Sequence, residues 1–171
     1  MNAFSSSGQR SGRPHAMGGF TLIELIVVIT ILGVLAAVAL PRFTSLQADA
    51  RKAKADAIFG SMRAAAGIVK STAMVKAVDC TAASVTNGVT LEGRGIDLVY
   101  CYPSASATAT AGILGASNID PTADAVSVAV AAGVLSVTIS GGAAGCKIDY
   151  TPPTGANLAP TITNTATANN C

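Results

Sequence analysis

The sequence predicts an α+β fold in which a long N-terminal α-helix, its first half transmembrane, packs against a small antiparallel β-sheet head. Residues 20–40 form an almost unbroken apolar run, and residues 42–76 carry apolar side chains at helical intervals of three and four. Residues 77–171 hold short alternating segments between glycines and prolines. We expect four parts: a polar segment at 1–19, a transmembrane helix at 20–41, an amphipathic helix at 42–76 and a globular β-rich head at 77–171.

The apolar run from Phe20 to Leu40 is 21 residues long, and its only polar residues are Thr21, Glu24 and Thr30. A bilayer core about 30 Å thick takes about 20 helical residues. The run is therefore long enough to span a membrane, where a helix satisfies its own backbone hydrogen bonds. The alternative is a buried helix of a soluble protein, for which so long an apolar stretch is unusual.

Glu24 is the one charged residue of this run. An acid at membrane depth costs about 2.5 kcal/mol or more, so it is kept where it has a partner or a task. Met17, Gly18 and Gly19 come immediately before the run, and a cut after Gly19 would give Phe20 a new α-amino group. That amine is a partner for the Glu24 carboxylate of the same or a neighbouring chain. The alternative is that Glu24 only lies near the lipid headgroups.

The segment from Gly19 to Leu25, GFTLIEL, followed by the apolar run, resembles the N-terminal signature of type IV prepilins and of type II secretion pseudopilins. The resemblance implies a pilin fold and a prepilin leader peptide at 1–19. It also implies a prepilin peptidase that cuts between Gly19 and Phe20 and methylates the Phe20 amine. Residues 20–41 would then be the polymerisation helix, in which Glu24 neutralises the Phe20 amine of an adjacent subunit during filament assembly.

Gly33 and Pro41 mark the expected bend of the long helix. Glycine weakens a helix, and proline removes one backbone hydrogen bond and forces a kink. The resemblance implies the same, with this segment loosening in assembled filaments. Beyond Pro41 the helical pattern resumes, and one helix from Phe20 to about Lys76 would be about 85 Å long.

The polar residues 1–19 precede the apolar run, whereas in an ordinary secretory signal the apolar run comes before the cut. We expect a cytoplasmic leader. The positive-inside rule counts Arg10 and Arg13 on one side of the run against Arg42, Arg51, Lys52 and Lys54 on the other. That count alone would place the head in the cytoplasm. The cysteines and the resemblance instead place it in the periplasm, on an inner-membrane prepilin that later joins an extracellular filament on the cell surface.

Charge is divided between the helix and the head. Residues 42–76 have a net charge of +5, residues 77–171 have a net charge of −4, and the chain without residues 1–19 is neutral. A basic stem below an acidic head suits subunits stacked along an axis, although solvated faces alone would look the same.

Four cysteines, Cys80, Cys101, Cys146 and Cys171, lie in the head. An even number in this region favours two disulfides formed in an oxidising compartment. Of the three possible pairings we choose the sequential one, 80–101 and 146–171, which closes two local loops and makes a C-terminal disulfide loop. A zinc site is the alternative, but the four residues lack ligand spacing.

Short strands are expected in the head. They are Gly88 to Leu91, Gly95 to Tyr102, two strands in 125–140 around Ala132-Gly133, and Cys146 to Tyr150. A short helix is expected near 111–116, and the tail from Pro152 to Cys171 is expected to be a loop. The segment VYCYP at 99–103 and the helix sequence after Pro41 are similar to the mannose-sensitive haemagglutinin branch of type IVa pilins.

Catalytic motifs are not evident. The only histidine, His15, lies in the leader, and the glycine-rich segment 141–145 lacks the Lys-Ser/Thr of a phosphate loop. Asp97, Asp120 and Asp124 lack the spacing of an EF-hand calcium loop. We therefore expect no enzyme activity, cofactor or metal. Basic stem residues offer contacts to DNA phosphates, but aromatics to stack bases are few.

We predict the structural subunit of a type IV pilus, serving adhesion, attachment, motility or DNA uptake. Its partners would be further copies of itself, the inner membrane, the prepilin peptidase, and the assembly platform with its minor pilins. One alternative is a type II secretion pseudopilin, although the C-terminal disulfide loop favours a pilin. Another, of a different class, is a single-span membrane-anchored ligand-binding or enzymatic ectodomain.

Overall fold

The computed structural model describes residues 19–171. All of the predicted leader except Gly19 lies outside the described residues. The chain divides into two units, the first ending at Leu40 and the second running from Pro41 to Cys171. Helix α1, Leu22–Val75, contributes to both units, in place of the expected range from Phe20 to about Lys76.

In the first unit, the residues of α1 from Leu22 to Leu40 have almost no cover from the rest of the described chain. Of the helices in the described residues, α1 is the one long and apolar enough to cross a membrane. Pro41 lies inside α1, so the proline interrupts the hydrogen-bond ladder without ending the helix. The bend at Gly33 and Pro41 stays a prediction.

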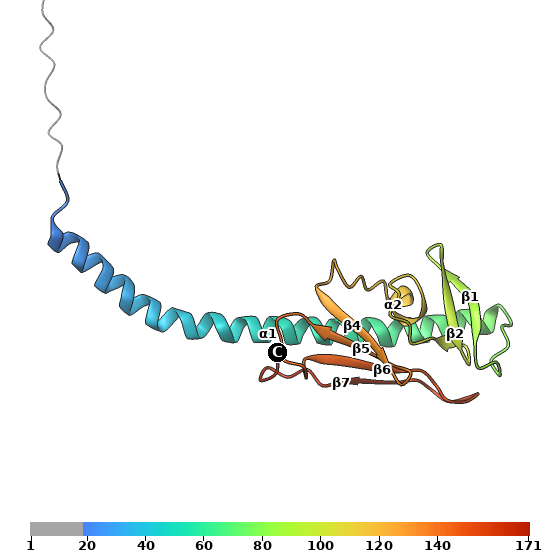
Figure 1. The fold of residues 1–171 in the computed structure, drawn as a ribbon. Helices are drawn as coiled ribbons and strands as arrows, with labels where there is room; N and C mark the ends of the chain where they lie inside the picture. Colours follow the sequence, from blue (N-terminus) through green and yellow to red (C-terminus); the bar gives the residue numbers. More distant parts are fainter. Residues whose placement is uncertain (1–18) are drawn as a thin grey trace, which may run out of the picture. The chain divides into compact units, whose positions relative to one another are not determined.

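In the second unit, the rest of α1 carries two antiparallel sheets (Figure 1). The three-stranded sheet has the order β1-β2-β3, with β1 Val85–Leu91, β2 Arg94–Val99 and β3 Tyr102–Pro103. The four-stranded sheet has the order β4-β5-β6-β7, with β4 Val126–Ala131, β5 Val134–Ile139, β6 Lys147–Thr151 and β7 Thr161–Asn164. The short helix α2, Gly112–Ser117, lies between the two sheets in the sequence.

Two clusters of buried side chains join the sheets to one face of α1. Met62 and its neighbours on α1 pack against the four-stranded sheet, where Leu135 and Ile148 are fully buried, and against α2. Two turns beyond Met62, Val69 and Ala73 pack against Ile96 and other side chains of the three-stranded sheet. The alanines of this α1 face favour helix and let the sheets approach closely. The expected α+β fold is confirmed.

The end of α1 is fixed by backbone geometry. Ala77 adopts a left-handed conformation with φ of 52°, and the Val78 amide donates to the Ala73 carbonyl at 3.0 Å. This is the arrangement of a Schellman motif, which satisfies the last carbonyls of a helix. The last carbonyls of α1 are therefore satisfied before the chain continues to β1.

Most predicted head elements are present, and two predictions are wrong. The hairpin around Ala132-Gly133 forms as β4 and β5, and the short helix forms as α2. The strand predicted from Gly95 to Tyr102 is interrupted, because Tyr100 and Cys101 both adopt left-handed conformations between β2 and β3. The tail predicted to be a loop contains β7, which pairs with β6 at the edge of the sheet.

The cysteines form the sequential pairs, Cys80–Cys101 and Cys146–Cys171, and no free cysteine is found in residues 19–171. The second disulfide ties the end of the tail to the sheet, and Arg51 of α1 donates a hydrogen bond from Nε to the Cys171 carbonyl. The tail is therefore attached to both the sheet and the helix.

Replacing both Cys146 and Cys171 with serine should lower the free energy of unfolding by about 3.5 kcal/mol. The disulfide closes a loop with a sequence separation of 25 residues, and the chain-entropy model gives this loss for a loop of that length. Urea unfolding of the detergent-solubilised chain measures it. The same replacement at Cys80 and Cys101, separated by 21 residues, is the comparison. A loss below about 1 kcal/mol at 146–171 would contradict the expectation.

Tyr150 of β6 links the two sheets. Its ring is fully buried, and its hydroxyl donates to the Pro103 carbonyl on β3 at 2.6 Å. Burial, with the nearby Tyr102, raises the pKa of Tyr150 above its usual value of 10.0. The phenol therefore stays protonated in the folded chain at pH values where it ionises in the unfolded chain.

The Tyr150→Phe variant should lose less stability than the wild-type chain as the pH rises above about 10. With the folded pKa raised, the contribution of Tyr150 is complete below about pH 10 and declines above it, since only the unfolded chain then releases the proton. At neutral pH the variant should lose about 1 to 2 kcal/mol, because the Pro103 carbonyl has no donor. Unfolding free energies at pH 7 and above pH 10 measure both effects. An unchanged alkaline slope would contradict the assignment.

Candidate processing and assembly site

The start of α1 places Thr21 and Glu24 together. The Thr21 amide and hydroxyl both donate to Glu24 Oε2 at 3.0 Å, and the Glu24 amide donates to Thr21 Oγ1 at 3.3 Å. Thr21 precedes the first helical residue, Leu22. The two side chains therefore form a capping box, in which each satisfies a backbone amide that the helix leaves unpaired.

This capping role is a second use of Glu24 that our sequence interpretation missed. The signal was present, because Thr-x-x-Glu before an apolar run is the pattern of a capping box. Both bonds from Thr21 to the carboxylate end on Oε2. The pairing of Glu24 with a Phe20 amine stays a prediction, since Phe20 is joined to Gly19 in the described chain.

The predicted cleavage site, between Gly19 and Phe20, is exposed. The Phe20 side chain is 89% exposed, and a Cβ built on Gly19 would meet no atom within 4 Å. A processing enzyme therefore meets no obstacle from the described residues at the bond between them. Nothing in the packing of residues 19–171 demands glycine at position 19, so a requirement for glycine would come from the enzyme.

The apolar surface beyond this site is not covered by any other part of residues 19–171. Large side chains all around the first unit of α1 are exposed, including Leu22 at 75%, Val34 at 69% and Val38 at 70%. A helix that is apolar on every side is buried in lipid or against other helices. The first unit can therefore either span a bilayer or lie inside an assembly of several chains.

Few ionisable groups of the second unit lie close to one another. Within residues 19–171, no group of three His, Cys, Asp or Glu side chains is placed to hold a metal ion. The Lys52 ammonium lies 2.7 Å from the Asp56 carboxylate on α1, and this bond, together with one from Asn164, lowers the pKa of Asp56. The geometry of this region is that of ordinary surface pairs.

Comparisons with known proteins agree with this geometry. A family model described as the prokaryotic N-terminal methylation motif matches residues 15–40. The fimbrial protein EcpC of Eikenella corrodens is 34% identical over 122 residues, which cover 71% of each chain. The type IV narrow pilus major component PilA5 of Thermus thermophilus is 50% identical over 50 residues, covering 29% of this chain and 43% of PilA5. The prepilin peptidase-dependent protein A of Clostridium perfringens is 40% identical over 76 residues, covering 44% of this chain and 50% of that protein.

No solved structure matches the chain significantly. The matched region spans less than half of PilA5 and half of the Clostridium protein. The exposed apolar helix, together with the matched N-terminal motif, indicates a precursor anchored in a membrane by its N-terminal helix. The chain belongs to the type IV pilin family. The similarity to the mannose-sensitive haemagglutinin branch stays a prediction.

Proposed function

We propose that this chain is the structural subunit of a type IV pilus. In this proposal the leader is cut off between Gly19 and Phe20, Phe20 is N-methylated, and the mature chain polymerises through residues 20–41. The observation that carries it is the apolar first unit of α1, exposed on all sides and bearing a single carboxylate at its start. The names of its relatives EcpC and PilA5 support a filament rather than an enzyme.

The physical basis is a change of surroundings for one helix. Before assembly, lipid covers the apolar side chains of residues 20–41. A helix needs about 20 residues to cross the bilayer, and this segment is long enough. In a filament, the same side chains of neighbouring copies cover one another. The Glu24 carboxylate would be costly in either place without a partner. The Phe20 amine of an adjacent copy supplies that partner once cleavage has created it.

The cellular location and the partners of the chain follow from the same proposal. The leader would be cytoplasmic and the head periplasmic while the prepilin sits in the inner membrane, and the pilus would be extracellular. The prepilin peptidase, the assembly platform and minor pilins would act in turn. The segment between Gly33 and Pro41 would bend or loosen as the filament stretches. Adhesion, attachment, motility and DNA uptake are the uses that such a surface filament serves.

A pseudopilin is the second candidate, because the N-terminal motif is shared between the two classes. The Cys146–Cys171 disulfide favours a pilin, as the family resemblance implies for a C-terminal disulfide loop. The pilus and fimbrial names of two relatives favour it as well. A single-span ectodomain with another task is the third candidate.

Electron microscopy of sheared surface filaments, with mass spectrometry of their subunit, tests the proposal. A pilin should give abundant filaments whose subunit begins with N-methylated Phe20. If the chain is instead a pseudopilin, deletion of its gene should block protein secretion and leave surface filaments unaffected. An anchored ectodomain should remain in the membrane as dispersed single chains. Recovery of the chain with residues 1–19 still attached and no filament would overturn the proposal.

A further inference from the structure

Two different surfaces flank α1 at the same height in the second unit. One is a groove of about 560 Å³, here called the cationic groove, lined by Phe59, Arg63, Ala66, Gly67, Tyr102 and residues 160–162. The other lies beside the turn between β1 and β2, where Glu92 and Leu91 border a groove with Ser61 and Ile68. The segment 59–68 of α1 thus contributes lining residues to both grooves.

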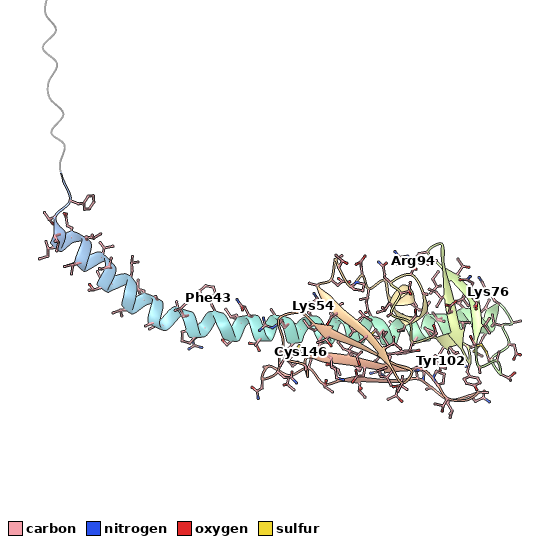
Figure 2. All side chains as sticks on the ribbon, viewed as in Figure 1. Phe43, Lys54, Lys76, Arg94, Tyr102 and Cys146 are labelled. Carbon is pink, nitrogen blue, oxygen red and sulfur yellow. A yellow bond between two sulfur atoms is a disulfide. The ribbon has the colours of Figure 1, made fainter. Side chains whose placement is uncertain are left out.

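The two surfaces lie on nearly opposite sides of the helix. Arg63 and Ser61 are two residues apart, which at about 100° per residue places them about 160° apart around the axis. Figure 2 agrees with this geometry, with Arg94, next to the β1–β2 turn, on one side of α1 and Tyr102 on the other. A chain with a copy on each side would therefore offer a different surface to each neighbour.

Two positive charges without a salt bridge to residues 19–171 lie at the cationic groove: Arg63 in its lining, and Lys70 against the ring of Tyr102, which lines it. The Arg63 guanidinium lies 5.5 Å from the centre of the Phe59 ring, and the Lys70 ammonium lies 4.7 Å from that of Tyr102. Cation–π contacts of this kind hold the two charges against aromatic walls. Neither cation takes part in a salt bridge with any of residues 19–171.

The opposite surface presents Glu92 at the tip of a hairpin. Glu92 is exposed and has no salt bridge in the part of the chain that the structure describes. Two cations near this side among residues 19–171 have acceptors within the chain, and Arg94 also lies close enough to Asp120 to interact with its carboxylate. Arg94 donates to Asn118 Oδ1 at 2.7 Å, and Lys54 donates to the Asp124 carbonyl. Glu92 is therefore an exposed carboxylate, at the tip of the hairpin, that is available to a partner.

Turn chemistry does not account for a glutamate at this position. Glu92 and Gly93 form a two-residue connection between β1 and β2, with φ angles of 48° and 79°. Such a turn prefers Asn-Gly, because asparagine tolerates the left-handed conformation better than other side chains do. Asparagine at position 92 should therefore suit the turn at least as well as glutamate does.

We propose that neighbouring copies in the filament make a side-by-side contact in which Glu92 of one copy enters the cationic groove of the next and pairs with its Arg63 and Lys70. The partner is a second copy of this chain, so the inference rests on the proposed function. Because the two surfaces differ, the contact is heterologous, and such contacts repeat into rings or helical filaments. A carboxylate between two cations on aromatic walls makes charge-assisted bonds that are partly shielded from water.

The first test uses Glu92→Asn in the full chain, produced as the only copy in the cell. Asparagine suits the turn better than glutamate, so the melting temperature of the detergent-solubilised subunit should rise. The yield of sheared filaments per total subunit should fall about tenfold, the factor that a loss of 1.4 kcal/mol of contact gives. A variant that is more stable but assembles less cannot be explained by poor folding.

Ala132→Asn is the matched control. Ala132 and Gly133 connect β4 and β5 with φ angles of 50° and 77°, nearly the same geometry as Glu92 and Gly93. The control should therefore raise the melting temperature to a similar extent and leave the filament yield unchanged. Wild-type yield from Glu92→Asn would overturn the inference, as would an equal loss of yield from both variants.

A charge exchange tests the pairing itself. Glu92→Arg and Arg63→Glu should each lower the yield, and the double variant should restore it, because the charges again attract across the contact. Failure of the double variant to recover, or normal filaments from Arg63→Glu alone, would overturn the pairing. If the wild-type chain itself gave no filaments, the proposed function would fail; wild-type filaments with unaffected variants would overturn the lateral contact alone.

Discussion

Glu24→Gln is expected to abolish filament assembly while leaving the start of α1 intact. Glutamine serves in a capping box as glutamate does, so its amide oxygen can still accept the bonds from Thr21 now made to Oε2. A neutral amide cannot balance the positive Phe20 amine of an adjacent subunit. Filament yield after shearing, compared with the total amount of processed subunit in the membrane, measures the effect.

Two further substitutions separate the two uses of Glu24. Thr21→Val removes the hydroxyl that caps the helix at a cost of about 1 kcal/mol, yet it keeps the carboxylate, so filaments should still form. Glu24→Ala removes both the cap and the charge, and it should stop assembly while the chain still inserts in the membrane. Normal piliation in Glu24→Gln, with piliation lost in Thr21→Val, would show that capping and not charge balance is the function of Glu24.

The long helix and the hairpin of β4 and β5 were predictable, because their signals are local. The apolar residues of α1 recur at intervals of three and four. Ala132-Gly133 separates two alternating segments, and β5 buries every second residue, including Leu135 and Val137. Where neighbouring residues determine the structure, the sequence pattern is sufficient.

The interrupted strand after β2 could not be predicted, because distant contacts determine it. The residues Tyr100 and Cys101 carry no turn signal, and both belong to types that favour or tolerate strands. Their left-handed conformations are held from elsewhere in the chain. The Tyr100 amide donates to the Ala82 carbonyl at 3.1 Å, and Cys101 is bonded to Cys80. Tertiary contacts overrode local preference at this place.

The tail gives the same lesson. Its threonines, asparagines and alanines suggest a loop, but Thr161–Asn164 pairs with β6 to form β7. Asn164 also donates to the Asp56 carboxylate of α1 at 2.8 Å, across 108 residues of sequence. The cationic groove was unpredictable for the same reason, since it joins α1, β3 and the start of β7. The residues of the N-terminal site, in contrast, are neighbours in the sequence, and so the motif alone pointed to them.

Gly19→Val should block removal of the leader and, with it, all filament formation. The effect would come from the peptidase and not from the fold, because a Cβ at position 19 meets no atom within 4 Å and Phe20 is exposed. A branched side chain next to the bond to be cut would prevent this segment from entering an enzyme site shaped for glycine. Without the cut there is no free Phe20 amine, and Glu24 loses the partner that assembly requires. Mass spectrometry of the membrane-bound subunit should show residues 1–19 still attached.

Gly60→Val is the control for this substitution, because Gly60 is also exposed and a Cβ there likewise meets no atom within 4 Å. The control chain should be cut as efficiently as the wild-type chain, since position 60 is far from the bond along the sequence. Equal processing of both variants would mean that the enzyme does not recognise Gly19, and the cleavage site would have to be placed elsewhere. A block confined to Gly19→Val, in a chain that still enters the membrane, would tie the new amine to the loss of filaments.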